Sequence, residues 1–141
     1  MFRHLFATAL TGALLIWPAT AAEASTHFFK AESASWPTSY TKGASAAGVS
    51  VRWVAGGDRL YVKDTAADGK RVGAWFIIVG SGSVDGICYS TLGSGKAGLC
   101  DLELTEGRSL TIFLATCDAD TANCNDDNQW KVLPSYIETT T

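Results

Sequence analysis

The sequence predicts an all-β protein, an antiparallel β-sandwich or small barrel of about six to eight strands held by two disulfides. Short runs of alternating apolar and polar residues recur along the chain, and turns rich in Gly and Asp separate them. The 141 residues show no sustained helical periodicity, which argues against an α-helical or α/β fold. An even number of cysteines, four, predicts disulfides and an oxidising compartment.

Residues 1–24 have the layout of a secretory signal peptide. A short basic start precedes an apolar run from Leu5 to Trp17, and small residues follow. The run is shorter than the ~18 residues that a membrane-spanning helix needs, so cleavage is favoured over anchoring. Of two Ala-x-Ala sites, 19–21 and 22–24, we favour cleavage after Ala24. The expected product is secreted and extracellular, with no membrane span after signal cleavage.

Residues 25–48 predict an irregular N-terminal arm or an edge strand. They are rich in Ser, Thr, Ala and Gly, and neither the strand period nor the helix period is sustained. Residues 49–141 predict a single β-domain, because this length suffices for one core and no internal repeat divides it.

Residues 49–63 predict a hairpin around Gly56–Gly57. The apolar residues that alternate with polar ones are Val49, Val51, Trp53, Leu60 and Val62. A type I′ turn requires positive φ at both central residues, which the two glycines supply. This register pairs Trp53 with Leu60 on the buried face and lets Arg52 lie on Tyr61 on the other face.

Residues 72–79 predict a strand covered on both faces, because the run is apolar with little alternation. Trp75 is therefore expected in the core. The turn that precedes this strand contains Asp68-Gly69, and a Gly- and Ser-rich segment, 80–83, ends it.

A second hairpin is predicted from residues 87–90 and 98–104, with 92–96 at its tip. Pairing Tyr89 with Leu99 places the two neighbouring cysteines opposite each other, at a separation that a disulfide can span.

Two further strand signals lie near the C-terminus, at residues 109–117 and 130–137, and Pro134 interrupts the second. Apolar residues at alternate positions from Leu110 to Leu114 share one face of the first strand. A polar loop, 118–128, connects the two.

The four cysteines allow three pairings. We predict Cys88–Cys100 and Cys117–Cys124, because each pair brackets a turn-rich segment. Loops this short contribute roughly 2 to 3 kcal/mol each in the chain-entropy model. A metal site is the alternative, but the spacings lack a Cys-x-x-Cys pair and no histidine is nearby.

Some of these features resemble the small secreted β proteins of actinomycetes, which are mostly uncharacterised. The similar features are the Leu60-Tyr-Val-Lys-Asp-Thr-Ala-Ala-Asp-Gly69 segment, the Cys88 to Cys100 loop with its Gly-Ser-Gly tip, Glu106-Gly107-Arg108, and the late Cys117 and Cys124. The resemblance covers residues 49–124. It implies export and a β-sandwich, and it brings no catalytic residues to this chain.

The charge and the histidine content disfavour several functions. The net charge is -3 and the basic residues are scattered, so no nucleic-acid partner is expected. Beyond the predicted signal peptide, His27 is the one histidine, and it lies near the start of the mature chain. Serine-hydrolase chemistry needs a histidine as the base for its nucleophile, so this chemistry is disfavoured. We therefore predict a protein that is not an enzyme. A weak glycan hydrolase is a remaining alternative, with candidate carboxylates at Asp58, Asp64, Asp68, Asp85, Asp101 and Glu103.

The polar loop suggests a possible cofactor. No cofactor is required, but Ca²⁺ takes six to eight hard oxygen ligands, and this loop is dense in them. The candidate ligands are Asp118, Asp120, Asp126 and Asp127. Their spacing does not fit an EF-hand, so a solvated acidic loop is the favoured interpretation.

Aromatic residues supply the leading functional hypothesis. The candidates for an exposed stacking face are Trp36, Tyr40, Tyr61, Trp75, Tyr89 and Trp130, and among these Trp36, Tyr61 and Tyr89 are favoured. The expected function is an extracellular binding domain that recognises a polysaccharide or a cell-surface component. A secreted inhibitor or toxin-like module that probes a protein with the Tyr89 to Leu99 loop is the alternative.

Overall fold

The computed structural model describes residues 25–80 and 84–141, so the predicted signal peptide lies outside the described residues. In chain order the strands are β1 (His27–Lys30), β2 (Glu32–Ser33), β3 (Lys42–Ala46), β4 (Val49–Val54), β5 (Arg59–Asp64), β6 (Lys70–Val79), β7 (Val84–Ser90), β8 (Ala97–Asp101), β9 (Ser109–Asp118) and β10 (Lys131–Thr140). A short 3₁₀ helix, Asp127–Gln129, precedes β10, and the described residues contain no α-helix. The all-β prediction is confirmed.

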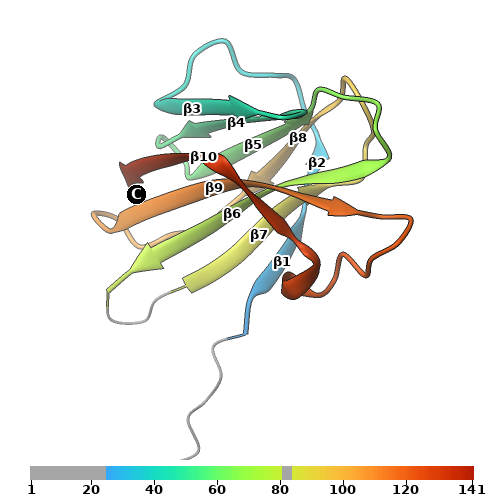
Figure 1. The fold of residues 1–141 in the computed structure, drawn as a ribbon. Helices are drawn as coiled ribbons and strands as arrows, with labels where there is room; N and C mark the ends of the chain where they lie inside the picture. Colours follow the sequence, from blue (N-terminus) through green and yellow to red (C-terminus); the bar gives the residue numbers. More distant parts are fainter. Residues whose placement is uncertain (1–24, 81–83) are drawn as a thin grey trace, which may run out of the picture.

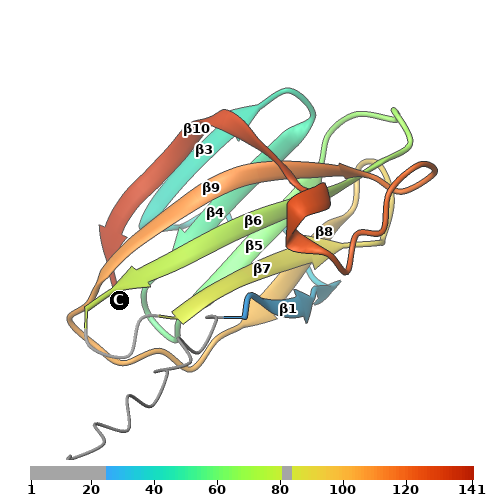
Figure 2. The ribbon, with the colours of Figure 1, turned by 60° about the horizontal axis from the view of Figure 1, so that its bottom comes forward.

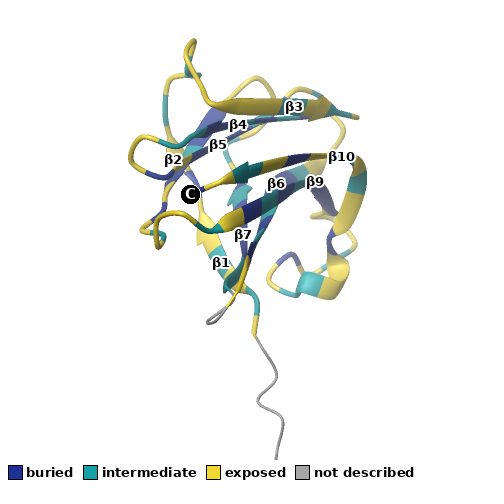
Figure 3. Ribbon diagram, turned by 90° about the vertical axis from the view of Figure 1, so that its left-hand side faces the viewer, coloured by how far each residue is buried: buried dark blue, intermediate teal, exposed yellow. Residues whose placement is uncertain are grey.

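The strands form two five-stranded sheets that pack face to face (Figure 1; Figure 3). Sheet A has the order β1-β7-β6-β9-β10, and sheet B has the order β2-β8-β5-β4-β3. Pairing is antiparallel except between β1 and β7, which run parallel. The β-sandwich is thus confirmed, with more strands than the expected six to eight. The excess comes from residues 25–48, which supply β1, β2 and β3.

The predicted hairpin is present as β4 and β5, with Trp53 opposite Leu60 and Arg52 opposite Tyr61. Its turn differs from the type I′ prediction, because positive φ falls at Gly57 and Asp58 instead of at both glycines. The Asp58 carbonyl then accepts from the Leu102 N–H and its carboxylate from the Leu104 N–H, which ties the turn to the chain beyond β8.

Both predicted disulfides are present, Cys88–Cys100 and Cys117–Cys124. The predicted hairpin around the first is wrong, because β7 pairs with β6 and β1 in sheet A whereas β8 pairs with β5 and β2 in sheet B. The connection at residues 91–96 therefore passes from one sheet to the other. The disulfide joins the two sheets through the core instead of bridging neighbouring strands.

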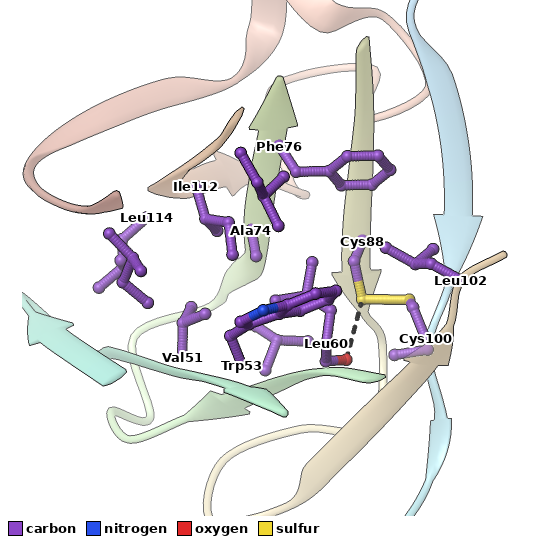
Figure 4. Close-up of a cluster of buried hydrophobic side chains, with 14 of the residues drawn as sticks. Val51, Trp53, Leu60, Ala74, Phe76, Cys88, Cys100, Leu102, Ile112 and Leu114 are labelled. Atoms are coloured by element: carbon purple, nitrogen blue, oxygen red, sulfur yellow. Dashed lines mark hydrogen bonds between the residues drawn. A yellow bond between two sulfur atoms is a disulfide. The ribbon is translucent and has the colours of Figure 1, made fainter. Parts of the chain in front are cut away.

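The main core surrounds this disulfide (Figure 4). Trp53 is fully buried beside it, and Cys88 Sγ lies 3.8 Å from the Leu60 carbonyl oxygen. That approach is a contact and not a donated hydrogen bond, because a bridged sulfur has no hydrogen. Phe76 and Ile112 close the core from sheet A. Trp53 Nε1 has no hydrogen-bond partner among the described residues, so its indole is held by packing alone.

The N-terminal arm contributes one short strand to each sheet. β1 forms one edge of sheet A beside β7, and β2 forms one edge of sheet B beside β8. Ala31, which is buried between them, marks the crossing, and its N–H donates to the Tyr89 carbonyl at 2.8 Å. Residues 25–48 thus contain edge strands of both sheets.

The last strand shows the effect of Pro134. In β10 the register shifts between Val132 and Tyr136, since Val132 pairs with Ala115 and Tyr136 with Phe113. Proline cannot donate to the ladder, so an irregularity at this position of an edge strand is expected.

Two disulfides in a domain of this size are typical of an oxidising, extracellular type of environment. In the part of the chain that the structure describes, there is no helix with the length and apolarity to cross a bilayer.

We expect the disulfide between the sheets to contribute more stability than the outer one. Its residues are 12 apart in sequence against 7, which favours it slightly in loop entropy, at about 3 kcal/mol against about 2.5. Both pairs are buried, but substituting Cys88 and Cys100 by Ala opens a cavity in the main core whereas Cys117 and Cys124 belong to the smaller one, so the loss for the first pair should exceed about 3 kcal/mol. Urea unfolding of the two double variants measures the difference. An equal or larger loss for Cys117→Ala/Cys124→Ala would contradict this assignment.

Candidate functional site

The outer face of sheet A is divided into a covered half and an open half. The segment from Cys117 to Trp130 folds back over one end of the sheet, where Figure 2 shows it in front of the strands. A second, smaller core lies beneath it, formed by Ile87, Ala115, Cys117, Cys124 and Trp130. Where this segment covers the sheet, β6 is buried on both faces, as the sequence predicts.

Trp130 is the side chain that closes the covered half. Its indole N–H donates to the Cys124 carbonyl at 3.0 Å, and its ring lies 6.3 Å from the ring of Tyr89, centroid to centroid. A Cβ at Gly73 would lie 2.6 Å from Trp130 Cζ3, so only glycine lets the indole rest on β6 here.

The open half carries three aromatic side chains in one row across adjacent strands. Trp75 on β6 pairs with Phe113 on β9, and Phe113 pairs with Tyr136 on β10. Neighbouring strands lie about 4.8 Å apart, so the row spans roughly 10 Å. We call Trp75, Phe113 and Tyr136 the aromatic row. The expectation that Trp75 belongs to the core is wrong for the main core: its side chain points away from the sandwich, is half-buried and packs against the edge of the second core.

The aromatic row is partly exposed, since Trp75 and Phe113 are half-buried and Tyr136 is exposed. Tyr136 is 54% exposed, and its ring lies 5.8 Å from that of Phe113 at an interplanar angle of 40°. A shallow depression of about 160 Å³ lies at the Trp75 and Phe113 part of the row, lined by Trp75, Ile77, Phe113 and Val132. Such a surface suits an extended ligand that lies across the strands better than a small molecule held in a pocket.

Polar groups lie beside the aromatic row, in the next set of paired residues whose side chains point to the same face of sheet A. We call this set the next rung. Asp85 pairs with Ile77, Ile77 with Thr111, and Thr111 with Glu138, so two carboxylates and a hydroxyl lie one rung away from the aromatic row. The Asp85 carboxylate also accepts a hydrogen bond from the Trp75 indole N–H. This bond fixes the orientation of the indole on the open face.

The structure does not bring the three favoured aromatic residues together. Trp36 and Tyr61 belong to the outer side of sheet B, whereas Tyr89 lies on the covered half of sheet A. Tyr61 is only 8% exposed, so its expected exposure is wrong, and Trp36 and Tyr89 are half-buried. Of the other candidates, Tyr40 is exposed and Trp130 is buried.

The acidic loop uses its side chains on its own backbone. Asp118 accepts from the Asp120 N–H at 3.2 Å, and Asp126 caps the 3₁₀ helix by accepting from the Asn128 N–H at 3.0 Å. Asp127 accepts from the Thr26 hydroxyl at 2.7 Å, which ties the loop to the segment before β1. Within residues 25–80 and 84–141, no group of three or more His, Cys, Asp or Glu side chains is arranged to hold a metal ion.

Several of the carboxylates considered for hydrolysis also have backbone partners. Asp64 accepts from the Ala66 N–H and Asp68 from the Lys70 N–H, both at turns, as the sequence of these turns predicts. Asp85 is engaged with Trp75. The glycan-hydrolase alternative stays an untested prediction.

Sequence reasoning missed Phe113 and Tyr136, although a signal for each was present. Placing Leu110, Ile112 and Leu114 on one face of a strand puts Phe113 on the opposite face. Which residues stand beside Phe113 depends on strand order and on the irregularity in β10, and neither can be read from the sequence.

Comparisons of the chain with protein-family models, with curated proteins and with solved structures find no match.

Removing the Asp85 carboxylate should release the indole of Trp75. We expect Asp85→Ala to cost about 1 kcal/mol of stability, the usual value for one hydrogen bond, and to speed hydrogen exchange at the Trp75 indole N–H. NMR exchange measurements on the indole resonances, assigned with Trp75→Phe, provide the test, and the Trp130 indole is the internal control. An unchanged Trp75 exchange rate would show that the bond does not hold the ring.

Proposed function

We propose that this protein is an exported, non-enzymatic binding domain that recognises a polysaccharide through the aromatic row of sheet A. The observation that carries the proposal is the register that aligns Trp75, Phe113 and Tyr136 on three adjacent strands. The ligand would lie across the strands, with the apolar faces of its sugar rings on the aromatic side chains.

The chemistry of the row supports a sugar ligand. Aromatic rings present an electron-rich face to the C–H groups of a pyranose ring, and they lose little conformational entropy on binding. The polar rung with Asp85, Thr111 and Glu138 supplies acceptors and a donor for sugar hydroxyls beside the stacking surface. A purely apolar partner would offer Thr111 and Glu138 no hydrogen bonds.

The rigidity of the face also supports binding. The row sits on strands of a disulfide-linked sandwich, and Trp75 is oriented by Asp85. A preorganised surface loses less entropy when a ligand docks, so more of the contact energy appears as affinity. The predicted signal peptide and the two disulfides favour action outside the cell.

A depletion assay on insoluble cellulose, chitin and isolated cell walls tests the proposal. We expect the oxidised domain to be removed from solution by at least one of these solids. Trp75→Ala and Tyr136→Ala should each weaken binding about tenfold, which corresponds to losing one stacked ring. Tyr40→Ala, an exposed tyrosine on the other sheet, is the matched control and should bind the neutral solids like the parent protein.

Two outcomes would contradict the proposal. The first is no depletion on any solid. The second is self-association, measured by light scattering, that disappears in Tyr136→Ala while polysaccharide binding is absent, since it would assign the row to contact between copies of the chain.

A further inference from the structure

The outer face of sheet B carries a second feature, independent of the aromatic row. The connection from Ala34 to Thr41 begins at β2 on one edge of the sheet and ends at β3 on the other edge. It therefore crosses β8, β5 and β4 on its way, as the arching segment before β3 in Figure 1 illustrates. Trp36 and Tyr40 are on this connection, and their rings lie against side chains of the sheet.

Several residues of this connection contact Arg52 on β4. Its guanidinium carbon lies 4.7 Å from the centroid of the Trp36 ring and 4.3 Å from that of Tyr40. One of its N–H groups donates to the Pro37 carbonyl. Since a guanidinium has five N–H donors in its plane, donors remain at the edge that the rings do not cover.

Gly43 makes this arrangement possible. It pairs with Arg52 across β3 and β4, and a Cβ there would lie 2.9 Å from Tyr40 Cε2. The absence of a side chain lets the Tyr40 ring lie over β3 beside the guanidinium.

A second cation lies close to the same ring. Lys63 Nζ is 5.7 Å from the centroid of Trp36, and Lys63 pairs with Ser50, two residues before Arg52 on β4. Two positive charges thus flank one indole in a chain whose net charge is -3. An anion bound nearby would offset their mutual repulsion.

A depression of about 280 Å³ adjoins Arg52, lined among others by Trp36, Tyr40, Ser45 and Ser50. The hydroxyl oxygens of the two serines lie 2.7 Å apart, so one hydroxyl donates to the other. The accepting hydroxyl keeps its own hydrogen, which is free to donate to a ligand. The volume is at the lower end for ligand pockets and suits one sugar ring.

We propose that this depression binds the carboxylate of an acidic sugar, with Arg52 as the anchoring residue. The planar fork of a guanidinium binds a carboxylate bidentately, as it also binds tetrahedral oxyanions, so the contacts to the sugar ring and its hydroxyls distinguish this ligand from a free anion. Tyr40 and Trp36 contact the sugar ring, and Ser45 or Ser50 binds one of its hydroxyls. This site lies on the sheet opposite the aromatic row, so it stands whether or not the row binds polysaccharide.

The test is an NMR titration of the oxidised protein with sodium glucuronate, with glucose as the neutral control and sodium sulfate as the tetrahedral anion. We expect glucuronate to shift the Trp36 indole resonance, assigned with Trp36→Phe, and the Ser50 amide along one saturable curve. Glucose and sulfate should each bind at least about tenfold more weakly, because each lacks one part of the recognition.

Variants then assign the contact. Arg52→Gln should weaken glucuronate about tenfold or more, and Arg52→Lys should recover only part of the affinity, since an ammonium keeps the charge but loses the fork. Val79→Ala, an exposed residue of β6 in sheet A that belongs to neither proposed site, is the control and should leave the titration unchanged. If Arg52→Gln disturbs the spectrum outside this face, Ser45→Ala/Ser50→Ala replaces it and should weaken glucuronate without changing the fold.

Three results would overturn the proposal. The first is that glucose shifts the same resonances as strongly as glucuronate, which would remove the carboxylate from the recognition. Sulfate could compete equally well, which would reduce the site to general anion attraction. Glucuronate affinity that is unchanged in both the Arg52 and the double serine variants would place binding elsewhere.

Discussion

The covalent link between Cys88 and Cys100 is the constraint on which the two candidate binding faces depend. It joins the inner sides of β7 and β8 across the core, next to Trp53, and so fixes the two sheets relative to each other. The N-terminal arm reinforces the same place, because β1 pairs with β7 and β2 with β8. With the inner faces held in this way, the outer faces are free to carry side chains that the main core does not need.

Both outer faces are partly covered by a long connection, and each connection places a tryptophan on the sheet. Trp130 closes the segment over sheet A and rests on Gly73, whereas Trp36 lies over sheet B against Arg52 and Lys63. The two candidate sites are what these connections leave open. The uncovered part of sheet A is aromatic with polar groups at its border, and that of sheet B is cationic and hydroxyl-lined, so the two faces suit different ligand chemistry.

Local patterns predicted the hairpin of β4 and β5, the strand β6 and both cysteine pairs, because alternation, turns and short loops are visible in consecutive residues. The sheet to which β8 belongs could not be predicted in this way. Cysteines that bracket a short turn fit a hairpin and a crossing between sheets equally well, and only distant pairing decides between them. Tyr61 shows the same limit of local patterns. Its position between Leu60 and Val62 predicts that its side chain lies on the outer face of sheet B, but whether it is buried there depends on the segment that covers that face.

The aromatic row also has a structural explanation, and the two explanations differ in what they require. Cross-strand aromatic pairs stabilise a sheet by about 0.2–1 kcal/mol each, which accounts for Phe113 beside Tyr136 without any ligand. Sheet stability does not require an indole whose N–H is bound to a carboxylate on the next strand, because an unbonded exposed indole can donate to water. The bond between Asp85 and Trp75 adds to the packing that holds this half-buried ring, and a fixed orientation benefits a surface that binds more than one that only packs. Trp75 is therefore the residue of the row whose geometry speaks most directly for recognition.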